Sequence, residues 1–289
     1  MTFTIYANLD QEARWSGLGV PAHVARRISA ASALLAALAP DGEDVEIWAP
    51  AAVDPDRLQM DRAPAMRVGV PKRWNLAWAD PDGKHVNDRR FALELAREVD
   101  GIALAGTRVI ESVDDLGGEW PERWVAKAVW SAAGRDRARG EGPPTGELRA
   151  RVANLIARAG AIVVEPWLER VLDVGVCGFV GSKPLPPHTL LVDERGGFLG
   201  IDLREPELPP GTRELLETIA ALAGKELLRA DYLGPYTIDA FVYRGPHGPA
   251  LHALCELNAR YTFGHVARAL GARVLIAPAA DDPTTAWVA

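Results

Sequence analysis

The side chains with the clearest chemical meaning lie near the C-terminal end of the sequence, in two segments that alternate like the strands of a hairpin. Alternation places Asp239 on one face of YTIDAFVY, and it places Glu256 and Asn258 together on one face of LHALCELNA. If the connection between the segments pairs Tyr243 with His252, Asp239 lies directly opposite Glu256. The pairing depends on this register, because a slip of one residue would turn one set to the other face.

Like charges that face each other across two strands call for a cation. Two carboxylates about 5 Å apart repel each other by about 3 kcal/mol at an effective dielectric constant of 20. The carbonyl of Asn258 adds a third hard oxygen beside Glu256, and such a set suits Mg²⁺, which keeps water and phosphate oxygens in its shell. Arg260, two residues further on, could contact the phosphate. An exposed strand face on which Arg260 neutralises Glu256 is the alternative.

A second group of residues suits phosphate binding. Lys127 lies within the predicted strand 124–130, ahead of a loop of small residues that includes Ser131 and Gly134. The lysine could neutralise phosphate charge while the small side chains let backbone amides approach the oxygens. An ordinary lysine at a strand edge is the alternative. Of the three arginines that follow, we expect one to contact phosphate and name Arg135 as the candidate.

The hairpin motif resembles the metal-binding end of the ATP-grasp superfamily, in which an Asp on one strand and a Glu-x-Asn on the next hold Mg²⁺ against ATP phosphates. Three further segments are similar to motifs of that family and occur in the same order. They are Asn87-Asp88-Arg89 before a helix, WVAKAVWSAAGRDR around Lys127, and VVEPWLERVLDVGV. The resemblance covers residues 87–270, and the order of four motifs is more specific than any one of them.

The resemblance implies a role for each position. Lys127 would be the lysine that precedes the phosphate-covering loop, Glu165 would lie near the adenine amino group, and Asp173 would be the acid that binds ribose. Trp167 and Leu168 could present backbone groups and an apolar face to adenine, although Trp167 could equally be ordinary core.

The sequence departs from the family pattern in three ways. Arg89 stands where the first ATP-binding lysine is usual, so we expect it to contact a phosphate with a different geometry. Asp173 is one methylene shorter than the more common glutamate. The phosphate loop has one glycine where many members have several.

From the resemblance we expect a fold of class α/β and α+β, namely an ATP-grasp fold. It would have an N-terminal α/β (pre-ATP-grasp) domain over 1–86, an ATP-grasp domain over 87–275 with a small lid subdomain at about 121–164 and a C-terminal antiparallel-sheet ATP-binding subdomain, and a flexible tail over 276–289.

The resemblance also implies a reaction. With ATP and Mg²⁺ as cofactors, a small-molecule carboxylate would be phosphorylated and the acyl phosphate attacked by an amine or similar nucleophile, giving an ADP-forming carboxylate–amine ligase. Lys127 and Arg260 would be catalytic, because they spread the charge that develops on the phosphate. A small-molecule kinase on the same scaffold and a nucleotide-binding regulatory protein without turnover are the alternatives.

The elements that position these residues follow from hydrophobic periodicity. The N-terminal segment alternates strand, helix and strand up to residue 49, and 50–86 is expected to be irregular. Asn8, Asp10 and Trp15 follow the first strand, where ligands bind in open α/β sheets, and His265 is a further candidate for substrate contact. Later elements are helices starting at Asp88, Thr145 and after Gly211, strands at 107–110, 124–130 and 161–168, an antiparallel sheet from 174 to 202, the closing hairpin and a last helix over 265–270.

Composition limits the classes of protein and partner. The 289 residues carry a net charge of −7, which argues against a nucleic-acid partner. The N-terminus has no signal-peptide pattern and no apolar run approaches eighteen residues, so we expect a cytoplasmic protein without membrane contact. The two cysteines are expected to be buried, reduced and, for want of partners, not metal ligands. Nine tryptophans, four of them before residue 80, allow either a homodimer surface or a substrate pocket.

Overall fold

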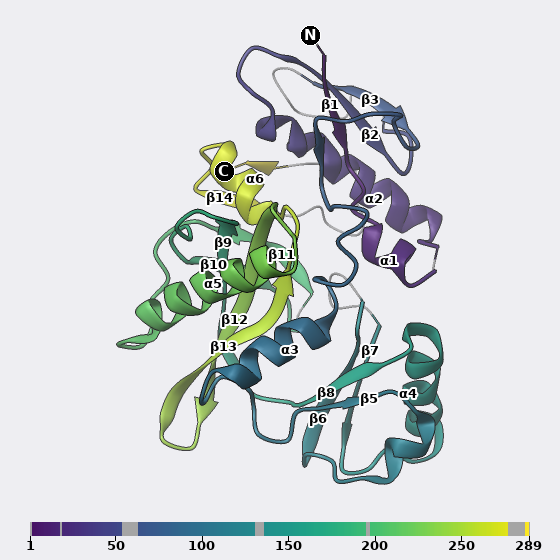
Figure 1. Ribbon diagram of the computed structural model, residues 1–289, viewed down its shortest axis with the longest axis vertical. Helices are drawn as coiled ribbons and strands as arrows, with labels where there is room; N and C mark the ends of the chain where they lie inside the picture. The colour runs from purple at the N-terminus through teal and green to yellow at the C-terminus, as the bar shows by residue number, and fades with distance from the viewer. Residues whose placement is uncertain are drawn as a thin grey trace.

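Three sheets follow one another along the chain in the computed structural model (Figure 1). The structure describes residues 2–17, 19–53, 63–130, 136–194, 197–276 and 287–288. None of the helices in these ranges combines the length and hydrophobicity that a bilayer-spanning segment needs.

The first sheet has four parallel strands in the order β3-β2-β1-β4. The predicted strand–helix–strand start is confirmed, whereas β3 and β4 lie in the segment that we expected to be irregular. β3 is mostly exposed and β4 has two residues, so neither has an apolar alternation that the sequence could reveal. The elements are β1 (Thr2–Tyr6), α1 (Gln11–Trp15), α2 (Ala22–Ser32), the 3₁₀ segment η1 (Ala33–Leu38), β2 (Asp44–Ala49), β3 (Ala65–Val68) and β4 (Leu76–Ala77).

The second sheet is antiparallel, has the order β5-β8-β6-β7 and carries α4 on one face. α4 ends at Gly160, as predicted, because this glycine adopts a left-handed conformation with φ of 77°. The sequence did not predict β7, because RARGE has no apolar alternation. Its ladder to β6 holds this segment extended. The elements are β5 (Arg108–Ile110), the 3₁₀ segment η3 (Val113–Gly117), β6 (Arg123–Ala128), β7 (Arg137–Glu141), α4 (Gly146–Ala159) and β8 (Ile162–Pro166).

The third sheet has seven strands in the order β13-β12-β9-β10-β11-β14-β15. The predicted antiparallel arrangement is confirmed for β9 to β13, while β14 and β15 were not predicted. The expected tail, 276–289, lies outside the described residues except for its first residue and β15. The strands are β9 (Arg170–Phe179), β10 (His188–Val192), β11 (Phe198–Asp202), β12 (Pro235–Gly245), β13 (Gly248–Asn258), β14 (Val274–Ile276) and β15 (Trp287–Val288).

The large sheet has a helix-covered face and a second face that borders the functional residues. α3 (Arg89–Glu98) and α5 (Thr212–Arg229) pack against it, and Tyr236, Ile238 and Ala240 of β12 contact them in one hydrophobic cluster. The alternating residues Thr237 and Asp239 therefore face the other way. As predicted, Asp88 caps α3, since its side chain accepts a hydrogen bond from the Arg90 backbone N–H.

A separate hydrophobic cluster joins the N-terminal sheet to the large sheet. Ile5, Leu35 and Ile47 from the N-terminal part share this cluster with Ile201 of β11 and Val266 of α6 (Phe263–Ala269). Because burial of each such side chain stabilises the fold by about 1.5–3 kcal/mol, the cluster holds the N-terminal part against β11 and α6.

Candidate active site

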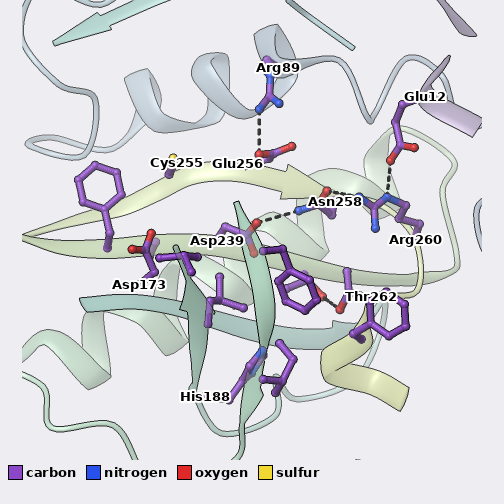
Figure 2. Close-up of a pocket in the computed structure, with 18 of the residues that line it drawn as sticks. Glu12, Arg89, Asp173, His188, Asp239, Cys255, Glu256, Asn258, Arg260 and Thr262 are labelled. Atoms are coloured by element: carbon purple, nitrogen blue, oxygen red, sulfur yellow. Dashed lines mark hydrogen bonds and ion pairs between the residues drawn. The ribbon is translucent and has the colours of Figure 1, made fainter. Parts of the chain in front are cut away.

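A cavity of about 280 Å³ lies against the free face of the large sheet (Figure 2). Side chains from the helices and loops of the N-terminal part and from strands of the other two sheets contribute to its wall. Asp239, Glu256, Asn258 and Arg260, which the sequence placed on facing strands, all line it. Its charged wall residues are Glu12, Arg89, Lys127, Arg137, Arg170, Asp173, Asp239, Glu256 and Arg260.

The predicted pairing of Asp239 with Glu256 is confirmed, but the residues between this pair and the turn have a different register from the expected one. Tyr243 pairs with Ala250 rather than with His252, because Gly245 and Gly248 close a tight two-residue turn. A bulge between Asp239 and Phe241 then shifts the register by two residues and brings the carboxylates opposite each other. For the same reason, Phe241 pairs with His252.

The two facing carboxylates have different neighbours. Glu256 Oε2 lies 2.9 Å from Arg89 Nη1. Burial disfavours the charge of Glu256, but the charge and hydrogen bond of Arg89, together with the charges of Lys127 and Arg260, outweigh burial and lower the pKa of Glu256. Asp239 accepts a hydrogen bond of 3.2 Å from the Asn258 amide. Burial, followed by the charge of Glu256, raises the pKa of Asp239 to about 7. The protein therefore favours the charge on Glu256 and disfavours the charge on Asp239.

Arg260 connects this carboxylate pair to the N-terminal part of the chain. Its Nη2 donates to Asn258 Oδ1 at 2.9 Å, and its Nε lies 2.6 Å from Glu12 Oε1. Both side chains of the Arg260–Glu12 pair are nearly buried, with exposed fractions of 13% and 7%. Figure 2 shows the resulting row of Asp239, Asn258, Arg260 and Glu12.

The sequence did not predict Glu12 as a site residue, although it indicated that the segment around it lies near a ligand. The segment after the first strand was expected to contact substrate through Asn8, Asp10 and Trp15, none of which lines the cavity. Asn8 is buried and bonds Ala79, and Asp10 pairs with Arg14 at 2.9 Å. The position at the carboxyl end of a parallel strand was the only signal for Glu12.

Lys127 lies at the centre of a second charged group. Its Nζ is 2.6 Å from Glu165 Oε2 and 3.5 Å from Cys255 Sγ. Burial opposes the ammonium charge, but Cys255 and Glu165 outweigh it and raise the pKa of Lys127. Lys127 borders the cavity, whereas Glu165 lies behind it and is already bonded, so its expected contact with an adenine amino group stays a prediction.

Cys255 differs from the sequence expectation in two respects. It is partly exposed and lines the cavity, whereas Cys177 is buried as predicted. It also has potential co-ligands for a metal, because donor atoms of Cys255, Glu165 and His252 lie within 4.8 Å of one another. The ammonium of Lys127 already supplies a cation to this group.

Asp173 lines the cavity, as a ribose-binding acid should, but its carboxylate is engaged. Arg170 Nη1 donates to Asp173 Oδ1 at 2.6 Å, and the Arg170 guanidinium stacks over the ring of Phe241 at 4.0 Å. Local sequence patterns did not indicate Arg170, since only the β9–β12 ladder brings the ring of Phe241 beside it.

The remaining predicted nucleotide contacts fall into two groups. Ser131, Gly134 and Arg135 lie outside the described residues. Trp167 and Leu168 are absent from the cavity wall; the Trp167 ring instead stacks with Arg139 at 3.7 Å, and its backbone N–H donates to Arg123. Arg137, which we had treated as a bystander, lines the cavity.

His265, a predicted candidate for substrate contact, has a structural role. Its Nδ1 accepts from the Thr262 backbone N–H at 3.2 Å, and its Nε2 lies 3.3 Å from the Gly178 carbonyl. These bonds fix the start of α6, and His265 does not line the cavity.

The donor atoms of Asp239, Glu256 and Asn258 suit a magnesium ion. Asp239, Glu256 and Asn258 offer three hard oxygens on neighbouring strands of one face, and two of them carry like charges. The raised pKa of Asp239 shows that this charge is not fully balanced by the protein.

The assembled fold can be compared with known proteins. No protein-family model matches the sequence, and no curated protein is significantly similar to it. Solved structures are similar over nearly the whole chain, and they include several ATP-grasp ligases. The chain has the ATP-grasp fold.

Three of these structures show the extent of the similarity. D-cycloserine synthetase is 14% identical, with a TM-score of 0.52 over 93% of this chain and 98% of that one. D-alanine–D-alanine ligase from Bacillus anthracis, complexed with ATP, is 12% identical, with a TM-score of 0.52 over 94% and 92%. N5-carboxyaminoimidazole synthetase from Staphylococcus aureus, complexed with ADP, is 11% identical, with a TM-score of 0.51 over 90% and 70%.

The comparison confirms the predicted fold class, with its parallel N-terminal sheet and two antiparallel sheets in an ATP-grasp arrangement. At 11 to 14% identity the similarity establishes the fold alone. The proposed domain boundaries at residues 86 and 275 stay predictions.

Proposed function

We propose that the chain is an ATP- and Mg²⁺-dependent ligase that joins a carboxylate to an amine, or to a similar nucleophile, through an acyl phosphate. One observation carries the proposal: the paired carboxylates Asp239 and Glu256 share a cavity with three buried or nearly buried cations, Arg89, Lys127 and Arg260. A site for polyphosphate needs both features, since metal ligands and cations together balance its charge.

In the proposed first step, a carboxylate oxygen of the substrate attacks the γ-phosphorus of ATP. The bond between this phosphorus and the bridging oxygen breaks, ADP leaves and an acyl phosphate forms. In the second step the amine nitrogen attacks the acyl carbon, loses a proton and expels phosphate. No covalent bond to the protein is needed.

The cations of the chain have separate tasks in this proposal. Lys127 and Arg89 neutralise phosphate oxygens from the side of β6 and α3, and Arg260 neutralises the transferred phosphoryl group from the side of β13. Arg260 is held in place by Glu12 and Asn258, which restrict its guanidinium to one orientation.

Asp239, Glu256 and Asn258 would hold the magnesium ion. When bound, the ion neutralises phosphate charge and orients the phosphoryl group for transfer. β6 and β7, which border the same cavity through Lys127 and Arg137, would limit the access of water to the acyl phosphate.

The experiment is calorimetric titration of ATP with and without Mg²⁺, followed by ADP release with candidate acids in the presence of hydroxylamine. Hydroxylamine converts an acyl phosphate into a hydroxamate and phosphate, so it replaces the unknown amine. We expect Mg²⁺-dependent ATP binding, lost in Asp239→Asn/Glu256→Gln and kept in Glu141→Gln, whose carboxylate is exposed on β7.

Two outcomes would contradict the proposal. Absence of ATP binding under both conditions would remove the nucleotide site altogether. A stable phosphorylated metabolite, formed without any hydroxamate, would identify a small-molecule kinase instead.

A further inference from the structure

The cavity has an apolar end that the ligation chemistry does not use. Leu9 and Trp78 come from the N-terminal part, and Leu190, Phe198 and Phe263 come from β10, β11 and the start of α6. The ring of Phe263 lies 5.2 Å from that of Trp78 and 5.8 Å from that of Phe198. Apolar side chains therefore surround this end of the cavity, which is open toward Asp239, Glu256 and Asn258.

One buried polar side chain, His188, borders this apolar end. It is the first residue of β10, has no exposed surface and lines the cavity. Neither ring nitrogen has a hydrogen-bond partner among the described residues. A buried polar group without a partner costs about 1–3 kcal/mol, so its presence here calls for an explanation.

The backbone makes room for this histidine. A Cβ atom at Gly175 or at Gly264 would lie 2.8 Å from His188 Nε2, so glycine is needed at both positions. Burial, with a smaller effect of the charge on Arg268, lowers the pKa of His188 to about 3. The imidazole is therefore neutral at physiological pH and can both donate and accept a hydrogen bond.

The apolar end adjoins the reacting end directly. Thr237 lies two residues before Asp239 on the same face of β12, and its hydroxyl is 2.9 Å from that of Thr262. A molecule that places a carboxylate beside Arg260 would thus extend its body past the Thr262 hydroxyl toward His188 (Figure 2). Leu190 lines the same cavity.

We propose that the apolar end binds the body of the carboxylate substrate, and that His188 forms a hydrogen bond with a neutral polar group on it. The substrate class is a carboxylic acid with an aromatic or branched aliphatic body that carries a hydroxyl or carbonyl group. This inference rests on the proposed ligase function. The wall residues Leu9, Leu190, Phe198 and Phe263 offer no counter-ion, so a second carboxylate against them would be unpaired and a neutral body is favoured.

The test uses four acids as probes in the hydroxylamine assay with MgATP: 3-(4-hydroxyphenyl)propionate, 3-phenylpropionate, acetate and succinate. We expect kcat/KM to be at least about tenfold higher for the hydroxyphenyl acid than for acetate, and succinate to be inactive. His188→Leu should abolish the preference for the hydroxyphenyl acid over 3-phenylpropionate. The control His247→Leu replaces an exposed histidine in the β12–β13 turn and should change neither ratio.

A second variant and a binding measurement keep the inference testable if His188→Leu fails to fold. Leu190→Trp fills the apolar end and should abolish calorimetric binding of 3-phenylpropionate while MgATP still binds. Acetate or succinate turned over as well as the aromatic acids would overturn the inference and leave the ligase function standing. Failure of 3-phenylpropionate and its hydroxylated analogue to bind at all would overturn it as well. Absence of MgATP binding in the native protein would instead refute the ligase proposal, and an aromatic acid that still bound would then be a ligand of the apolar end and not a ligase substrate.

Discussion

Asp239 and Glu256 lie directly opposite each other on β12 and β13, yet Glu256 faces a guanidinium and Asp239 faces a neutral amide. Arg89 contacts Glu256 at 2.9 Å, whereas Asn258 donates to Asp239 at 3.2 Å. The electrostatic cost of the pair is therefore concentrated on Asp239. This asymmetry makes the two carboxylates distinguishable by experiment.

Asp239→Asn should stabilise the metal-free protein. The change removes a buried charge that burial and Glu256 both disfavour, and we expect a gain of about 1 kcal/mol in the free energy of unfolding. The same change should weaken MgATP binding at least tenfold, because a metal ligand loses its charge. Urea unfolding in EDTA and calorimetry with MgATP measure the two effects.

Glu256→Gln is the matched comparison, because it removes the other carboxylate of the same pair. It should weaken MgATP binding as strongly, but it should lower the stability of the metal-free protein, since the buried guanidinium of Arg89 loses its ionic partner. Equal effects of the two substitutions on stability would contradict the asymmetry.

The pairing of these carboxylates shows what the sequence could predict. The two-residue period of each strand was enough to place Asp239, Glu256 and Asn258 on their faces, because alternation is a local property. The turn and the bulge between Asp239 and Phe241 depend on how the whole hairpin packs, and they shifted the register near the turn. The pairing of Asp239 with Glu256 was therefore predicted correctly, although the predicted register near the turn was wrong.

Residues that act through distant partners were out of reach. Glu12 is recognisable as a site residue only through its ion pair with Arg260, 248 positions later. Arg170 is recognisable only through its contact with the ring of Phe241. Periodicity does not carry such relationships, so these cavity residues emerged only when the three sheets were assembled. The same holds for β7, whose polar sequence is held by its neighbour.

Glu12→Gln should test the link between the N-terminal part and Arg260. Removing one member of a nearly buried ion pair costs about 3–5 kcal/mol when the other charge stays buried. Arg260 keeps its bonds to Asn258 and Tyr261, so we expect the lower end of this range. The free energy of unfolding of Glu12→Gln, Arg260→Gln and the double variant measures the coupling, which should exceed about 1 kcal/mol.

The outcome for MgATP is a second readout of the same pair. If Glu12 orients Arg260, Glu12→Gln should reduce the rate of ADP release more than it weakens MgATP binding. A change confined to stability, with kinetics unaffected, would show that the pair serves the fold alone. Glu46→Gln is a suitable control, because Glu46 pairs with Arg67 at a more exposed position in the same part of the chain.

Lys127→Met should separate stability from nucleotide binding. The substitution leaves Glu165 buried beside an apolar side chain, so the protein should be less stable and the pKa of Glu165, which Lys127 helps to hold low against burial, should rise. Lys127→Met/Glu165→Gln removes both charges and should recover most of the stability. MgATP binding should be lost in both variants, and its recovery in the double variant would refute a role for Lys127 in binding phosphate.

Acid should destabilise the protein through its buried histidines, and His265 offers the clearest test. Burial lowers its pKa to about 4, whereas an unfolded histidine has a pKa of about 6.5. As the pH falls, this histidine is protonated near pH 6.5 in the unfolded chain but only near pH 4 in the folded chain. Its contribution to the free energy of unfolding is therefore fully present above about pH 6.5 and is lost as the pH drops. Between pH 7 and pH 5 the loss is about 2 kcal/mol for one such histidine.

His188 and His252, whose pKa values are lowered to about 3 and about 4 by burial, act in the same direction. His265→Gln should reduce the slope of unfolding free energy against pH by about one proton between pH 6 and 5, even if its stability at pH 7 is lower. The exposed His247→Gln should leave the slope unchanged. An identical slope in His265→Gln and the native protein would mean that His265 is protonated in the folded state, contrary to the neutral ring whose Nδ1 accepts from the Thr262 backbone N–H.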